Sequence, residues 1–432
     1  MHRAPAPDPR APNVAYLERA RDLALDLLVE SLQGPVMIGD LLLRNVRPMA
    51  GPAVDVLVRR GIIEQLARDL EVPPGVLMID GQGGLLLPPF VDGHIHLDKT
   101  FWGLPWRPHE AGPTVLERIE NERRLRRELQ LAVDVQVERL ARQAISRGTL
   151  FIRNHTDIDT EIGLRNFEGV RAVRERLKDV LSIQIVAFPQ SGIVNRPGTA
   201  ELLDRAVKDG ADLIGGIDPA GLDGDPKGHL DVVFGIAARH GVGVDIHLHD
   251  PGALGALQLR LIIERTRALG LAGKVSVSHV FCLGMVDEVE LGQLLEMLVE
   301  QRIAIMTHGP GDRAVPPLAR LRTAGVAVFS GSDAIRDAWT PFGNADMLER
   351  AMILAWRNGF RTDELLHLTL DTVTRAGAAV LGLEGYGLDV GCRASFVVVP
   401  GETLAEAVVA RPPRTWVVSG GRVVARDGDC VL

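Results

Sequence analysis

Eight short apolar segments alternate with longer helical stretches between residues 89 and 385. They are FVDGHIH (90–96), TLFIRNH (149–155), SIQIVAF (182–188), LIGGID (213–218), GVDIHLH (243–249), VSVSHV (275–280), IAIMTH (303–308) and VAVFSGSD (326–333). This alternation is typical of βα units around a parallel sheet. Eight such units predict an α/β protein with a (β/α)₈ TIM-like barrel over residues 89–385.

Most of these segments are apolar until their carboxyl end, where His, Asp or Asn appears, or Gln just beyond. In a (β/α)₈ barrel the carboxyl ends of the strands and the loops after them form the active-site face. The histidines and carboxylates of the segments are therefore expected to converge on one mouth. His94 and His96 lie two residues apart on an extended chain, so both imidazoles can reach one ion. His247, His249, His279 and Asp333 end later segments, and imidazoles with one carboxylate are typical of a catalytic metal site.

The chain of 432 residues is too long for one compact core, and strand-like patterns flank the barrel region. Residues 37–88 and 386–432 are predicted to pair into one small β-sandwich domain that brings the two ends of the barrel together. Residues 1–36 form an extension with a proline-rich start. Within it, residues 14–32 carry apolar side chains at helical spacing behind Asn13, which predicts an amphipathic helix.

The net charge and the number of cysteines exclude several classes of function. A net charge of −8 and the lack of a concentrated basic face argue against a nucleic-acid partner. Five arginines between 118 and 127 are interleaved with glutamates, which favours a solvated helix face over an anion site. Three scattered cysteines, no 18-residue apolar run and no signal sequence favour a cytoplasmic protein without a membrane partner. Phosphate-loop, GxSxG and HExxH motifs are absent from the sequence.

The motifs PPFVDGHIHLDKT, DIHLHD, SHV and FSGSDAIRDAW resemble, in order and spacing, the cytosine deaminase branch of the amidohydrolase superfamily. The resemblance covers residues 37–425. It implies a single divalent ion, Zn²⁺ or Fe²⁺, with His94, His96, His247 and Asp333 as ligands. It also implies that His279 hydrogen-bonds the bound water or the substrate. Binuclear relatives add a lysine at the end of strand four, and LIGGIDPA has none there, which favours one metal.

A bound divalent metal lowers the pKa of its water to about 7, and Asp333 is a candidate general base for it, with His279 steering the attack. In the family, a glutamate three residues after the strand-five histidine protonates the ring and the leaving ammonia. This chain has the shorter Asp250 there. The loop shifts to compensate, or the substrate is placed differently, or the reaction is not deamination. Replacing Asp250 with Ala is expected to lower turnover by orders of magnitude. His249 either joins the proton relay or points away into the barrel wall.

Four further positions bear on the substrate. Gln190 in VAFPQSGI matches a family glutamine that hydrogen-bonds the heterocycle edge, with loop capping as its alternative role. Trp339 matches a tryptophan that packs on the substrate ring, or else belongs to the core. Ala334 replaces a family aspartate, and the strand-four loop offers Asp218 in a glycine-rich cover. These departures argue against cytosine itself and favour a small, polar, nitrogen-rich substrate.

The leading hypothesis is a metal-dependent deaminase that acts on a carbon–nitrogen bond of an amino-substituted nitrogen heterocycle. The alternative is hydrolysis of a cyclic or linear amide on the same metal site, which creates a new carboxylate. An inactive, metal-binding scaffold is the third hypothesis. The resemblance also implies a homo-oligomer, and the helix over 14–32 is one candidate for the contact.

Overall fold

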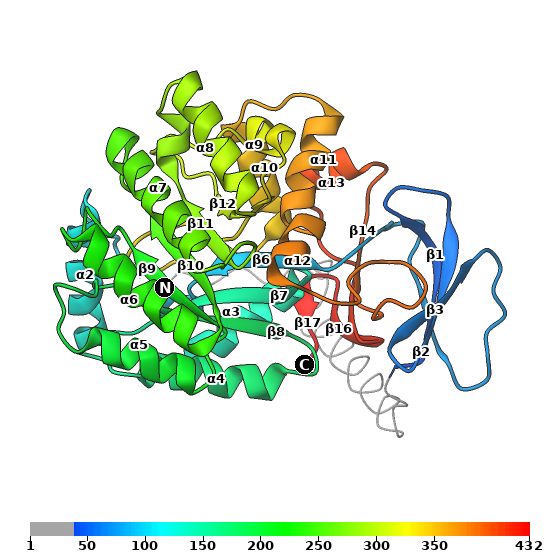
Figure 1. Ribbon diagram of the computed structural model, residues 1–432. Helices are drawn as coiled ribbons and strands as arrows, with labels where there is room; N and C mark the ends of the chain where they lie inside the picture. The colour runs from blue at the N-terminus through cyan, green and yellow to red at the C-terminus, as the bar shows by residue number, and fades with distance from the viewer. Residues whose placement is uncertain (1–38) are drawn as a thin grey trace, which may run out of the picture.

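The computed structural model describes residues 39–432, and the predicted helix over 14–32 lies outside them (Figure 1). Within residues 39–432, no helix combines the length and the apolar character needed to cross a membrane.

Eight parallel strands form the centre of the molecule. They are β6 (Phe90–Ile95), β7 (Thr149–Asp157), β8 (Ser182–Phe188), β9 (Leu213–Ile217), β10 (Gly243–Leu248), β11 (Val275–His279), β12 (Ala304–Met306) and β13 (Val328–Phe329). Each strand pairs in parallel with the next along the chain, and a bridge between Ile95 and Asp333 joins the first strand to the segment after the last. The predicted (β/α)₈ barrel is confirmed.

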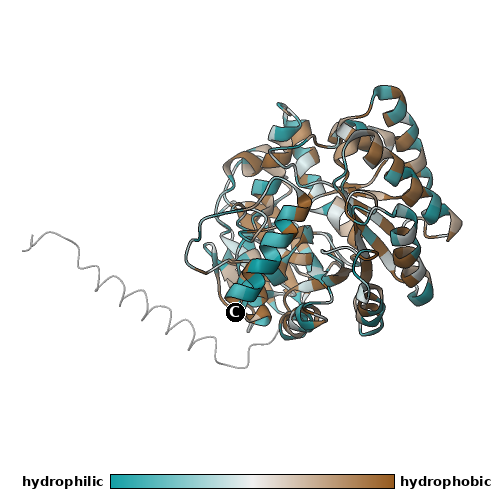
Figure 2. Ribbon diagram, turned by 90° about the vertical axis from the view of Figure 1, so that its left-hand side faces the viewer, coloured by the Kyte–Doolittle hydropathy of each residue, from teal (hydrophilic) through white to brown (hydrophobic). Residues whose placement is uncertain are grey.

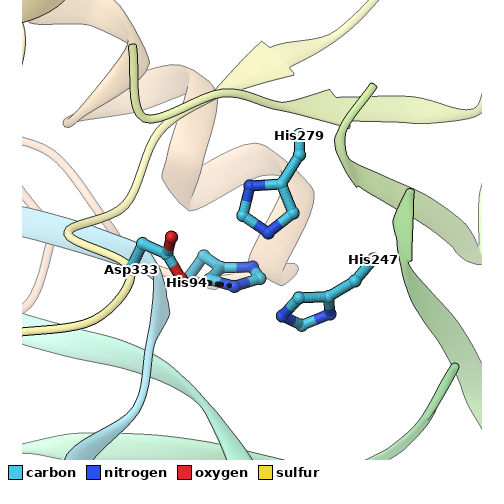
Figure 3. Close-up of side chains that lie close together, drawn as sticks. All are labelled: His94, His247, His279 and Asp333. Carbon is cyan, nitrogen blue, oxygen red and sulfur yellow. Dashed lines mark ion pairs between the residues drawn. The ribbon is translucent and has the colours of Figure 1, made fainter. Parts of the chain in front are cut away.

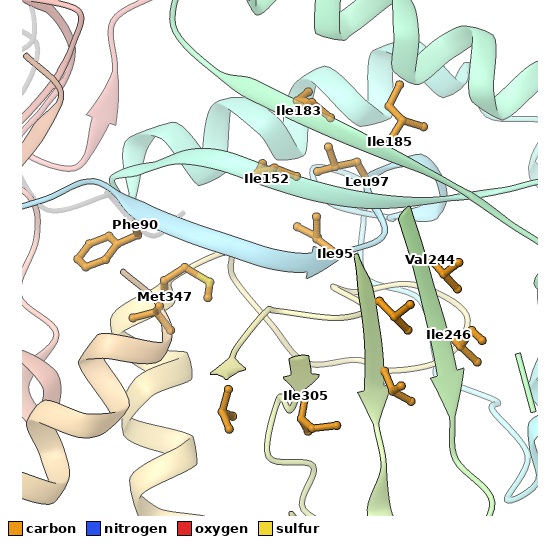
Figure 4. Close-up of a cluster of buried hydrophobic side chains, with 14 of the residues drawn as sticks. Phe90, Ile95, Leu97, Ile152, Ile183, Ile185, Val244, Ile246, Ile305 and Met347 are labelled. Atoms are coloured by element: carbon orange, nitrogen blue, oxygen red, sulfur yellow. The ribbon is translucent and has the colours of Figure 1, made fainter. Parts of the chain in front are cut away.

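Helices surround the strands, and Figure 2 shows that they mix hydrophilic with hydrophobic residues. They are α2 (Val115–Leu129), α3 (Val133–Ser146), α4 (Arg165–Leu177), α5 (Thr199–Lys208), α6 (Pro226–His240), α7 (Gly252–Ala268), α8 (Glu288–Glu300), α9 (Leu318–Ala324), α10 (Met347–Arg357), α11 (Asp363–Thr372), α12 (Arg375–Leu381) and α13 (Leu404–Ala410). Short 3₁₀ helices, η1 (Leu97–Lys99) and η2 (Phe281–Gly284), follow β6 and β11. Buried strand residues such as Ile152, Ile185 and Ile246 build the core between strands and helices (Figure 4). Because both faces of the strands are covered, the strands are largely apolar, and the polar residues at their carboxyl ends lie at the mouth of the barrel.

The segments before and after the barrel meet in a second sheet, with β1–β3 at the right of Figure 1. Its strands are β1 (Leu41–Pro48), β2 (Val54–Arg59), β3 (Ile62–Ala67), β4 (Leu77–Asp80), β5 (Leu85–Leu87), β14 (Phe396–Val399), β15 (Trp416–Ser419), β16 (Arg422–Arg426) and β17 (Asp429–Cys430). The antiparallel pair of β14 with β5 joins the two segments, as the predicted β-sandwich requires. Alternate residues of β14 point to opposite faces. Phe396 and Val398 therefore enter the core of this sheet, while Val397 and Val399 enter the barrel core.

Candidate metal centre and active site

Four side chains from four strand ends meet at the mouth of the barrel. Ligand atoms of His94, His247, His279 and Asp333 all lie within 4.8 Å of one another (Figure 3). His96 joins them, since its Nε2 lies 3.4 Å from Asp333 Oδ1 and 3.5 Å from His247 Nε2. The structure therefore brings together all four predicted metal ligands and also His279, the predicted partner of the water or substrate.

The unpaired nitrogens of this cluster fit a metal ion. His94 Nε2, His247 Nδ1 and His279 Nε2 are buried and have no hydrogen-bond partner. Buried polar atoms rarely stay unpaired, because each costs free energy when it is removed from water. Imidazole nitrogens that converge beside one carboxylate are the donor set that a divalent transition metal requires.

The remaining ring nitrogens hold the histidines in place. His96 Nδ1 lies 2.9 Å from the carbonyl oxygen of His155, which accepts a hydrogen bond from it, so Nε2 faces the cluster. His94 Nδ1 lies 3.0 Å from Ser278 Oγ, and that hydroxyl donates to Asp245 at 2.8 Å. Such outer partners fix the tautomer and orientation of a metal-binding imidazole.

Replacing Ser278 with Ala removes the hydrogen-bond partner of His94 Nδ1. We expect the affinity for the metal to fall by about 10- to 100-fold, as is usual when such an outer partner is lost. Competition against a chromogenic chelator measures this affinity. Ser276→Ala is the matched control, because Ser276 is buried on the same strand and accepts a bond from Arg153. Equal affinities in the two variants would show that Ser278 does not orient His94.

The backbone at the strand ends is strained. His279, Val280 and Asp333 have φ angles of 75°, 43° and 61°, in the left-handed region that non-glycine residues rarely adopt. The amide of Asp333 donates to the carbonyl of His94 at 2.7 Å, which ties the last strand end to the first. The chains are so close that a Cβ on Gly331 would lie 2.4 Å from the backbone of His94, so only glycine fits there. The strain and the close approach fix the carboxylate beside the histidines.

A cavity of about 1000 Å³ opens above the cluster, and both Gln190 and Trp339 line it as predicted for substrate contacts. Gln190 Oε1 accepts a hydrogen bond from Lys99 Nζ, and Trp339 Nε1 donates to the Glu122 carboxylate. One wall of the cavity thus presents an indole, an amide and an ammonium group.

His249 also lines the cavity, where its ring stacks on His279 with 4.4 Å between centroids. Asp218 accepts two bonds from it, from the backbone amide at 2.6 Å and from Nδ1 at 2.7 Å. Burial disfavours the imidazolium, but the Asp218 carboxylate outweighs it and raises the pKa of His249. Asp218 is not among the described residues that line the cavity. It contacts His249, whereas the sequence predicted that it contacts the substrate.

Asp250 lies outside the set of residues that line the cavity. Its carboxylate accepts bonds from the amide of Gly221 at 2.9 Å and from Gln258 Nε2 at 2.7 Å. Burial and the nearby Asp218 raise the pKa of Asp250. Among the described residues, no hydrogen bond or ion pair joins Asp250 to His279 or Asp333, and the neighbouring His249 lines the mouth.

The sequence analysis interpreted the arginines and glutamates at 118–127 as a solvated helix face, and this interpretation is wrong in part. The stretch is a helix, α2, but some of its charged side chains are buried. Glu122 is only 3% exposed and pairs with Lys99 Nζ at 3.3 Å, and Arg126 binds Asp157 and Asp159 at 2.7 and 2.9 Å. These side chains find opposite charges at the ends of β6 and β7, which stabilises their burial.

Several residues near the metal cluster were not predicted as site residues from the sequence. His308 follows β12 and lines the cavity. Its Nδ1 lies 3.2 Å from His279 Nδ1, and its Nε2 lies 3.5 Å from Asp333 Oδ2. His155 stacks on His94 at 3.8 Å and belongs to a second ligand-like group with Asp245. Both histidines lie at the ends of predicted strands, so the strand-end rule contained the signal. No local pattern marked Lys99 and Glu122 as a pair.

Replacing Glu122 with Gln leaves the Lys99 ammonium buried without its counter-charge. We expect the free energy of unfolding to fall by about 3 kcal/mol, the usual cost of breaking one side of a buried ion pair. Urea denaturation measures the change. Glu120→Gln on the exposed face of the same helix is the control, with an expected effect below about 0.5 kcal/mol. A loss of similar size in both variants would contradict the prediction.

Comparison with known proteins defines the family. A model of the amidohydrolase family matches residues 77–425. The solved structure of N-isopropylammelide isopropylaminohydrolase from Burkholderia multivorans is 48% identical, with a TM-score of 0.88 over 91% of this chain and 100% of that one. The N-isopropylammelide isopropyl amidohydrolase of Pseudomonas sp. (strain ADP) is 32% identical over 81% of this chain and 88% of that protein. The 5-methylcytosine deaminase of Klebsiella pneumoniae, liganded with 5-fluorocytosine, is 26% identical with a TM-score of 0.80, over 89% and 97% of the two chains.

The chain belongs to the amidohydrolase family, whose members are metal-dependent. Its relatives are deaminases and amidohydrolases, so it is a hydrolase that acts on carbon–nitrogen bonds. The resemblance to the deaminase-like branch is confirmed.

Proposed function

We propose that this enzyme hydrolyses the bond between a ring carbon of a nitrogen heterocycle and an exocyclic amine, and that the ring is retained. The observation that carries the proposal is His249, held by Asp218 and stacked on His279 inside the cavity. An imidazole in this position can protonate a departing nitrogen. The named activities of the triazine relatives favour an N-substituted amino-triazine over cytosine as the substrate class.

One divalent ion, Zn²⁺ or Fe²⁺, is held by His94, His96, His247 and Asp333 in this proposal. When bound, such an ion supplies a water of lowered pKa as the nucleophile. Asp333 would accept one proton from the water, and His279 would orient the oxygen toward the ring carbon. As the carbon–oxygen bond forms and the carbon–nitrogen bond breaks, the nitrogen would take a proton from His249, and the proton held by Asp333 would then replace it.

The ring is held on the opposite wall of the cavity. Trp339 packs against its flat face, because an aromatic side chain offers a large contact of low entropy cost. Gln190 and Lys99 lie at the edge of the ring in this proposal. Their amide and ammonium groups can hydrogen-bond the carbonyl oxygens and ring nitrogens there. In this arrangement Asp250 supports the Gly221 loop and does not act as the acid.

Amine release by the metal-analysed protein tests the proposal. The panel contains N-isopropylammelide, cytosine, aminopurines, pterins and creatinine-like rings, with Asp333→Asn as the blank. We expect release of an alkylamine from the triazine, with the ring recovered intact. If the metal is bound but no ring releases amine or ammonia, the proposal is wrong. Formation of a new carboxylate from a cyclic amide would then identify the amide hydrolase alternative.

A further inference from the structure

The cavity is larger than a single ring requires. Cavities of about 300 to 1,000 Å³ enclose whole drug-sized ligands, and this one measures about 1000 Å³. It reaches well beyond the histidine cluster, to the loop after β12 and to α10. The cavity therefore has room for a ring and a substituent of similar size.

The direction of the substituent follows from the position of His249. If His249 protonates the leaving nitrogen, the group on that nitrogen lies on the His249 side of the cluster. Phe281 is the next side chain on that side, with ring centroids 5.9 Å from His249 and 5.7 Å from His279. The guanidinium of Arg313 lies over Phe281, 5.9 Å from its centroid. A substituent on the leaving amine thus passes across Phe281 toward Arg313.

Arg313 has unused hydrogen-bond donors. Among the described residues, its side chain makes no hydrogen bond. The nearest carboxylate oxygen, on Asp312, is 3.7 Å away, and that side chain is 62% exposed. The same carboxylate lies 3.9 Å from Arg118, so one formal positive charge remains among the three residues. Arg357 donates to the carbonyl of Arg313 at 2.5 Å, which holds the loop against the cavity.

A guanidinium with a free planar fork matches a carboxylate, which it binds through two parallel hydrogen bonds. Phe281 provides an apolar floor for the carbon atoms between the nitrogen and the anion.

We propose that the leaving amine of the natural substrate carries a carboxylate, and that Arg313 is the residue that recognises it. The substrate class is then a heterocycle joined through nitrogen to an amino-acid-like group. This inference rests on the proposed function, because His249 gives the side on which the amine leaves.

Binding of three non-hydrolysable analogues to the metal-loaded protein tests the inference. In each, a methylene replaces the bridging nitrogen of a dioxotriazine, and the substituent ends in an isopropyl group, a carboxylate or the isosteric carboxamide. We expect the carboxylate to bind about 10- to 100-fold more tightly than the carboxamide by calorimetry, the range for hydrogen bonds to a charged group. Arg313→Gln should abolish this preference and leave the isopropyl analogue unaffected.

Arg320→Gln is the matched control, since it removes one exposed positive charge that pairs with Glu288 on the outside of the barrel. The preference should survive in this variant. Equal binding of carboxylate and carboxamide, or of none of the analogues, overturns the inference, as does a preference that persists in Arg313→Gln. Tighter binding of a phosphonate analogue than of the carboxylate would overturn the choice of anion. The failure of the inference and the failure of the proposed function are distinguishable. Amine release without a carboxylate preference refutes only the inference, whereas the preference without amine release refutes the function and leaves Arg313 as a carboxylate-binding residue of another reaction.

Discussion

Replacing Asp333 with Asn is expected to lower turnover by roughly 10⁴-fold, the scale seen when a group of a catalytic unit is removed, and to reduce the bound metal well below one ion per chain. The carboxylate supplies the negative charge of the ligand set and contacts both His94 and His96 through Oδ1. An amide of the same shape keeps neither that charge nor the capacity to accept a proton.

Asn is the informative replacement because residue 333 has a φ of 61°. Asn tolerates this left-handed conformation better than most residues do, so the fold should survive and the loss can be assigned to chemistry. Metal analysis and kcat are measured on the same preparation. Asp312→Asn, an exposed carboxylate of the same cavity, is the control and should keep its metal. A variant at 333 with full metal content and activity would exclude Asp333 as a ligand.

Replacing His249 with Gln is expected to lower kcat by about 10²- to 10⁴-fold, the usual contribution of a positioned general acid. Metal content and KM should change little, because Nδ1 of His249 is bound to Asp218 and its ring lies at the cavity wall. Substrates with less basic leaving amines need less help from an acid. The loss in the variant should therefore shrink as the pKa of the leaving amine falls.

The same assay on Asp250→Ala decides between the two candidate acids. Its carboxylate bonds to Gly221 and Gln258, so we now expect an effect of less than about 10-fold on kcat, from loop disorder rather than from a missing proton. If Asp250→Ala loses several orders of magnitude and shows the leaving-group dependence while His249→Gln does not, the roles assigned here are reversed.

The barrel and the convergence of the candidate metal ligands were predictable because both follow from periodic patterns. Residues at the carboxyl ends of parallel strands meet at one face of the barrel. The positions of His94, His247 and Asp333 at such strand ends were therefore enough to predict that they lie close together. The pairing of the two strand-rich segments was predictable for a similar reason, since each segment needs the other to bury its apolar face.

The hydrogen-bond partners of Asp218 and Asp250 were not predictable, because they depend on how two loops place these carboxylates in the folded chain. Asp218 reaches back to His249, and Asp250 turns to Gly221. The burial of Glu122 depends on a lysine 23 residues earlier and on how α2 packs. Neither feature has a local sequence pattern, since each forms only in the folded chain.

β14 contributes side chains to the barrel core and to the core of the second sheet. Neither core can therefore be completed before β14 has been synthesised. The first barrel strand and β5 are synthesised early, but β14, the strand that covers β5, follows the whole barrel in the chain. Val397 and Val399 are then missing from the barrel core, and Phe396 from the small sheet. Until β14 has been made, an apolar edge at β5 stays open to other chains, and such long-range pairings form slowly. Truncations that remove β14 should therefore yield aggregated protein, even though they remove no candidate residue of the active site.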